Sequence, residues 1–126
     1  MNTIVLLVDR TSGWSPEYWA EKIGGKRACG AQVMIERAGG CWLSIIRNDD
    51  VLDDFDEMER IRLDELVSEP VAYLVEWKGD DLVELMLRSV LPSTRAAIDN
   101  DHGLLVSVHQ VAKEPIESWV RASSLP

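Results

Sequence analysis

Two runs of alternating apolar and polar residues that meet at a glycine-containing turn constrain the fold of this chain more than any other feature. They occupy the stretch QVMIERAGGCWLSIIRN, residues 32–48, with the turn at residues 38–40. Alternation with a period of two is typical of a strand with one buried face, and so short a connection joins antiparallel neighbours. We therefore predict an antiparallel hairpin here. A second hairpin is predicted over residues 96–111, turning at Asn100 to Gly103, where a glycine can adopt a positive φ.

Apolar periodicity elsewhere predicts two more strands and three helices. Residues 3–9 are apolar on both faces, as in a central strand, and residues 71–77 alternate. Helices are expected at residues 16–23 after a Ser15 cap, within residues 78–92, and as a short last helix within residues 113–123. In the second helix, Asp80 or Asp81 is expected as the cap and Leu82, Leu85, Met86 and Val90 as the buried stripe. Hairpins outnumber parallel crossovers, which favours an α+β fold with a mostly antiparallel sheet and three to four short helices. The 126 residues fit a single domain, 1–126.

Residues 48–69, NDDVLDDFDEMERIRLDELVSE, hold almost all of the excess charge. They carry ten carboxylates against two arginines, a local charge of −8 in a chain of net charge −9. Apolar residues recur there at every third position: Leu52, Phe55, Met58 and Ile61, with Leu66 and Val67 as an extension. This pattern favours an amphipathic helix with an acidic outer face. The alternative is an acidic loop followed by a strand, because residues 61–67 partly alternate.

The stretch DNDHG, residues 99–103, most resembles a site for chemistry. Asp99 and Asp101 can share one face of a strand beside His102, which supports a hypothesis of a small enzyme. The spacing to His109 matches no standard zinc or iron pattern, and a calcium loop starting at Asp99 lacks its glycine and its final glutamate. Capping of a tight turn by the Asp and Asn side chains is the structural interpretation. We expect no metal, no cofactor and no catalytic residue.

The remaining composition narrows the classes of partner. An acidic chain repels the phosphates of nucleic acids and anionic membranes, so neither is expected. Cys29 and Cys41 match no C-x-x-C pattern and are expected to be reduced thiols. The apolar run at the start is too short for a signal segment or a membrane span. A cytoplasmic protein is the expectation.

Concentrated charge costs stability through self-repulsion, and a cationic partner turns that cost into attraction. We therefore expect the acidic segment to bind a basic protein. The candidate contact residues are Asp49, Asp50, Asp53, Asp54, Asp56, Glu57 and Glu59, with Trp42 as either a core residue or an interface anchor. Trp77 and Trp119 are expected in the core, and Trp14 in either place.

In its size, its acidity and its lack of a catalytic motif, the chain resembles the small immunity proteins of bacterial toxin systems. That resemblance implies inhibition of a cognate toxin domain, often a basic nuclease. Two alternatives stay open. One is a general interaction or structural subunit that forms a homo-oligomer through a sheet edge, and the other is the small enzyme that uses Asp99, Asp101 and His102.

Overall fold

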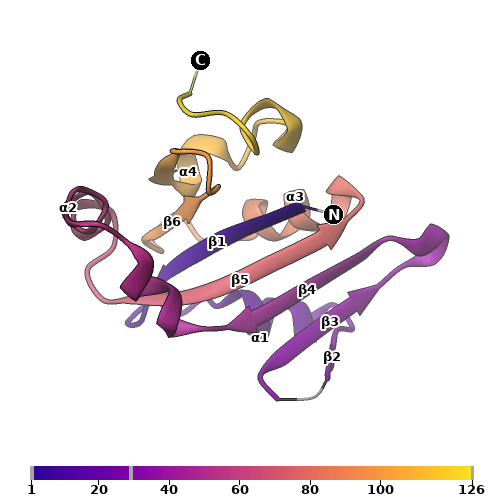
Figure 1. The fold of residues 1–126 in the computed structure, drawn as a ribbon. Helices are drawn as coiled ribbons and strands as arrows, with labels where there is room; N and C mark the ends of the chain where they lie inside the picture. The colour runs from indigo at the N-terminus through magenta and orange to yellow at the C-terminus, as the bar shows by residue number, and fades with distance from the viewer. Residues whose placement is uncertain (1, 29, 126) are drawn as a thin grey trace.

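One seven-stranded antiparallel sheet runs through the protein (Figure 1). The computed structural model describes residues 2–28 and 30–125. The strands are β1 (Asn2–Asp9), β2 (Lys26–Arg27), β3 (Gln32–Glu36), β4 (Trp42–Arg47), β5 (Pro70–Lys78), β6 (Ala96–Asp99) and β7 (Leu105–Ser107). The helices are α1 (Pro16–Lys22), α2 (Glu57–Leu66), α3 (Asp80–Arg88) and α4 (Val108–Val111), with 3₁₀ turns η1 (Ala38–Gly40), η2 (Asp49–Asp54) and η3 (Ile116–Ser118). The strand order is β2-β3-β4-β5-β1-β6-β7. The predicted α+β fold with an antiparallel sheet is confirmed.

Strand β1 lies inside the sheet between β5 and β6. It pairs with β5 along its whole length, from Asn2 opposite Trp77 to Asp9 opposite Pro70. Because successive side chains of a strand point to opposite faces, Ile4, Leu6 and Val8 belong to one core, while Leu7 belongs to another. The apolar character of both faces, from which a central strand was predicted, follows from this position.

The two cores differ in size because the helices are divided unequally between the faces. Helices α1, α3 and α4 and the C-terminal segment cover the larger core, which includes Trp14, Trp77 and Trp119. On the opposite face, α2 packs Leu63 and Val67 onto a small cluster around Leu7. Figure 1 shows α2 at one end of the sheet, away from α1 and α3. The core placement predicted for Trp77 and Trp119 is correct, and Trp14 joins them.

The helix ends follow the predicted capping in one case and depart from it in another. Ser15 accepts a hydrogen bond from the Tyr18 N–H at 3.2 Å and starts α1, as expected. Helix α3 instead has Gly79 at its N-cap, with φ 85°. The carboxylate of Asp80 accepts from the Trp77 indole N–H at 3.1 Å rather than capping the helix. Leu85, expected in the buried stripe, is 48% exposed.

The predicted amphipathic helix of the acidic segment is only partly correct. Residues 49–54 form a 3₁₀ turn, and the α-helix begins at Glu57. Met58 and Ile61, expected on the buried stripe, are 75% and 51% exposed. The residue that α2 buries is Leu63. Val67, which the predicted stripe included as an extension, is also buried, at the C-cap where the backbone is already extended.

The second hairpin is shorter than predicted. Strand β7 ends at Ser107, whose hydroxyl accepts from the His109 N–H, and α4 occupies residues that were expected to continue the strand. The predicted last helix is a single 3₁₀ turn, although Ile116, Trp119 and Val120 are buried as expected.

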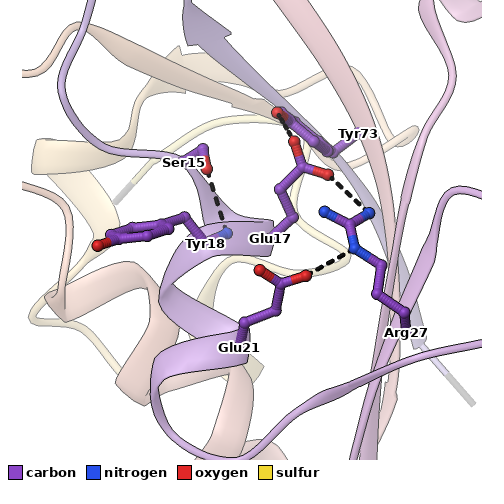
Figure 2. A network of polar contacts seen from close by, with 6 residues as sticks. All are labelled: Ser15, Glu17, Tyr18, Glu21, Arg27 and Tyr73. Carbon is purple, nitrogen blue, oxygen red and sulfur yellow. Dashed lines mark hydrogen bonds and ion pairs between the residues drawn. The ribbon is translucent and has the colours of Figure 1, made fainter.

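The two-residue strand β2 was missed, and Figure 2 shows what holds it. Arg27 bridges Glu21 at 2.6 Å and Glu17 at 3.4 Å, both on α1. Glu17 also accepts from the Tyr73 hydroxyl of β5 at 3.2 Å. Burial, reinforced by the neighbouring Glu17 carboxylate, raises the pKa of Tyr73 far above its usual value of 10.0. Tyr73 therefore acts as a neutral donor that ties α1 to the sheet.

Of the two cysteines, Cys41 is a free thiol, and Cys29 lies outside the described residues. In the part of the chain that is described, no helix is long and apolar enough to cross a membrane.

Candidate partner-binding surface

The 3₁₀ turn η2 is attached to the sheet by the first residues of the acidic segment. Asn48 starts the turn by accepting from the Asp50 N–H at 3.1 Å. Asp49 then points back to the sheet, where its Oδ1 accepts from the buried Ala72 N–H at 3.0 Å and its Oδ2 pairs with Arg47 at 3.0 Å. Partial burial works against ionisation, but the Ala72 and Arg47 contacts outweigh it and hold the pKa of Asp49 below 3.8. The carboxylate of Asp49, a predicted contact residue, is thus already bound by groups of the protein itself.

Two further predicted contact residues start helix α2. Asp56 accepts from the Glu59 N–H at 2.8 Å, and Glu59 accepts from the Asp56 N–H at 3.2 Å. This reciprocal capping box satisfies two N–H groups that the first helical turn leaves without partners. Their negative charge also suits the positive end of the helix dipole. Both side chains therefore have a structural task in addition to any contact with a partner.

The remaining predicted acids have no such internal task. Asp50, Asp53, Asp54 and Glu57 are exposed, and among residues 2–28 and 30–125 none of these four is paired with a lysine or arginine. We call these four residues the free acids. The two arginines of the acidic segment contact other groups instead of the free acids. Arg60 donates to the Leu52 carbonyl, and Arg62 donates to the Leu105 carbonyl and pairs with Glu65.

A hollow of about 470 Å³ opens beside the free acids. Its floor follows one row across three strands, because Val5 of β1 lies opposite Leu74 of β5 on one side and Asp99 of β6 on the other. The neighbouring row on the same face, Ala72–Leu7–Ala97, is covered by α2. The hollow therefore begins at the edge of the area that α2 covers. Phe55 supplies a further apolar wall.

The hollow is acidic around an apolar centre. Asp54 and Glu59 line it from η2 and α2, while Asp99 and Asp101 line it from β6 and the following turn. His102 and Arg121 also border it, and Arg121 donates to the Asn2 side chain at 2.9 Å. Carboxylates that are distant in sequence therefore surround one cavity.

Asp99 is the most perturbed carboxyl of the hollow. It is half-buried, and this burial raises its pKa above 3.8. The hydrogen bond from the Asp101 N–H to its Oδ1, at 2.9 Å, works in the opposite direction, while the negative charge of Asp101 adds to the rise. A cation in the hollow would offset the cost of keeping this group ionised.

Asn100 organises the turn that follows Asp99, and the sequence did not single it out as a key residue. Its side chain is buried, donates to the Trp119 and Ala122 carbonyls, and accepts from the His102 and Leu104 N–H groups. The sequence feature that could have identified Asn100 is its position in the run Asp-Asn-Asp-His-Gly, because Asn side chains in turns often bond to nearby backbone groups. The turn interpretation of this stretch agrees with these contacts.

The histidines considered for chemistry lie on different elements. His102 is exposed in the turn, while the His109 ring nitrogen lies 2.9 Å from the Thr94 carbonyl. Within the described ranges, no group of three His, Cys, Asp or Glu side chains is placed to hold a metal ion.

Trp42 lies on the same sheet face as the hollow but at the other end of β4. Arg47 lies five residue steps further along the strand, about 17 Å away at 3.3 Å per residue. It is partly exposed, in a row with Glu36 and Lys78. Between Trp42 and the hollow, the same sheet face carries the partly exposed Met34 and Ile46, and Ile46 pairs with Leu74. In Figure 1, α1 lies behind β3 and β4, and the other side of these strands is open.

The surface around η2 and the hollow therefore combines exposed carboxylates with neighbouring apolar side chains, and a ligand could contact both. Comparison of the chain with family models, with curated proteins and with solved structures returned no match.

Proposed function

We propose that this protein binds and neutralises a cationic protein partner, in the way that the small acidic immunity proteins of bacteria inhibit a cognate toxin domain. The observation that carries the proposal is the group of free acids, Asp50, Asp53, Asp54 and Glu57, which are exposed and form no ion pair within the described residues. They adjoin a hollow that gathers further carboxylates from β6. This protein also carries a net charge of −9.

The physical support is that such a surface has a cost which a partner removes. Like charges that are close together repel one another and destabilise the compact state. A basic surface that docks on them replaces repulsion with attraction and raises the association rate by electrostatic steering. If the partner is a nuclease, carboxylates can occupy the basic groove that holds nucleic-acid phosphates.

The test uses a variant with three of the free acids neutralised, D50N/D53N/E57Q. It spares Asp49, Asp56 and Glu59, whose side chains support the fold. The matched control, E36Q/E114Q/E117Q, changes the net charge by the same amount at exposed positions elsewhere. Both variants are compared with the native protein by calorimetric unfolding, so that any loss of binding is not a loss of folding.

The reading frames next to this chain are first searched for a secreted protein with a basic C-terminal domain, and such a domain, where one is encoded, is the binding partner for this test. We expect D50N/D53N/E57Q to weaken binding by about threefold to 150-fold at low salt, since each of three exposed pairs contributes about 0.2–1 kcal/mol. Most of the change should appear in the association rate and shrink at high salt. Equal binding by this variant and by the control at low ionic strength would contradict the proposal.

A second candidate function is self-association through the open sheet face. Trp42, Met34 and Ile46 are only partly buried there, and tryptophan and methionine are enriched at interfaces. This candidate predicts a dimer in sedimentation equilibrium that W42A dissociates and that D50N/D53N/E57Q leaves intact. A monomer at all concentrations would leave the cationic partner as the only candidate of the two.

A further inference from the structure

We infer that the hollow beside η2 receives one arginine side chain of the cationic partner, with its aliphatic stem on Val5 and Leu74 and its guanidinium between the two groups of carboxylates. The inference rests on the proposed function and adds to it a defined binding position. It concerns the row Leu74–Val5–Asp99 and the acids that border it.

The floor of the hollow suits the stem of a long basic side chain. Val5 and Leu74 are both partly exposed where the cover of α2 ends, and Phe55 closes the side of the hollow. Arginine and lysine bury their methylene groups on apolar surface while the charged end stays near polar groups. A purely polar ligand would leave this floor in contact with water.

The charges around the floor suit a guanidinium better than an ammonium. Asp54 of η2, Glu59 of α2, Asp99 of β6 and Asp101 of the following turn all line the hollow. A guanidinium has five N–H donors in a flat fork and can contact carboxylates on two sides, whereas an ammonium is a compact point charge. Asp99 Oδ1 accepts the Asp101 N–H, and in the described structure its other oxygen accepts no hydrogen bond.

The two basic groups that border the hollow leave this position open to a ligand. Arg121 donates to the Asn2 side chain and forms no ion pair with any of the described residues. His102 is exposed in the turn. The four carboxylates therefore outnumber the local cations even when His102 is protonated. Charge complementarity then selects a basic side chain as the occupant.

The experiment uses the intact protein and two small probes of nearly equal shape. N-acetyl-argininamide carries the guanidinium, and N-acetyl-citrullinamide replaces it with a neutral urea group. Methyl NMR spectra are recorded during titration with each probe. We expect saturable shifts of the Val5, Val51 and Leu74 methyl signals with the arginine probe, with a Kd on the order of 10 mM. The citrulline probe should shift them at least fivefold less.

The variant D99N keeps the shape of the side chain and its acceptor oxygen for the Asp101 N–H but removes one charge. It should weaken arginine binding at least threefold, while D50N, outside the residues that line the hollow, should change it less than twofold. Equal shifts from both probes, shifts confined to other methyl groups, or no effect of D99N would each overturn the inference.

The outcomes of this experiment and of the partner-binding test are separable. If D50N/D53N/E57Q weakens partner binding but the arginine probe does not reach the hollow, the proposed function stands and the arginine position is wrong. If the probe binds in the hollow but D50N/D53N/E57Q binds the partner normally, the position stands as an arginine site and the proposed role of the free acids is wrong.

Discussion

Replacing Asp49 with alanine should destabilise the fold rather than change the charge surface alone. Strand β4 ends at Arg47, so β4 no longer supplies an acceptor for the Ala72 N–H of β5. Asp49 Oδ1 takes that place at 3.0 Å, and Ala72 is fully buried. The other oxygen of Asp49 pairs with Arg47 at 3.0 Å. The alanine variant loses both contacts and leaves a backbone N–H without a partner.

The size of the effect follows from the two contacts. A buried donor left without an acceptor costs about 1–3 kcal/mol, and an exposed ion pair such as Arg47–Asp49 contributes about 0–1 kcal/mol. We expect D49A to lower the free energy of unfolding by about 2 kcal/mol, which for a chain of this length corresponds to about 8 °C in Tm. D49N keeps an acceptor oxygen and should lose about half as much.

The pH dependence gives a second readout. The folded-state pKa of Asp49 is lowered from 3.8 because the Ala72 and Arg47 contacts outweigh partial burial. Its ionised form therefore stabilises the fold above pH 3.8, and this contribution disappears as the pH falls through the lowered folded-state value. The gap between the native protein and D49N should narrow at low pH.

The assay is urea unfolding followed by tryptophan fluorescence at pH 7 and at acidic pH, with D50N as the control for a free acid. D50N should change the free energy of unfolding by no more than about 0.5 kcal/mol. A D49A variant as stable as D50N, or a gap for D49N that is unchanged at acidic pH, would refute the structural role of Asp49.

Three more predictions concern stability measured by urea unfolding. N100A should lose about 2–4 kcal/mol, because the buried Asn100 side chain makes four hydrogen bonds with backbone groups; a loss below 1 kcal/mol would contradict this. D99N should be more stable than the native protein at neutral pH, because burial raises the pKa of Asp99 and makes its ionised form unfavourable in the folded state. The difference in stability should vanish below pH 3.8, where Asp99 is protonated in both the folded and the unfolded chain. A D99N variant less stable than the native protein at pH 7 would contradict this prediction. L63A should cost about 2–5 kcal/mol and I61A less than 1 kcal/mol, because Leu63 is buried and Ile61 is exposed; equal losses would contradict the observed helix face.

The long strands could be predicted from sequence because their evidence is local. Alternation along β3, β4 and β5 and the glycines of the 38–40 turn depend only on residues adjacent in the chain. Gly39 and Gly40 have φ values of 83° and 80°, which other residues rarely adopt. Strand β2 could not be predicted, because two residues show no period. It pairs with β3 and is contacted by helix α1 through Arg27, and only the folded chain brings these groups together.

The acidic segment was harder because two signals conflicted. Leu52, Phe55, Met58 and Ile61 recur with a period of three, which drifts around an α-helix of 3.6 residues per turn. The stronger signal was the Asp56-x-x-Glu59 spacing of a capping box, which places the helix start at Glu57. A helix that begins there buries Leu63, and Val67, the residue at which the helix ends, packs into the same small core.

Charge counted along a sequence differs from charge available to a partner, and this protein shows the difference in both directions. The segment count includes Asp49, whose charge is paired with Arg47 outside the segment. It omits Asp99 and Asp101, which join the same surface because β6 pairs with β1 and places Asp99 opposite Val5. A partner meets the charges of the folded surface, so mutations that separate the proposed functions must be chosen by position on the sheet face rather than by position in the acidic run.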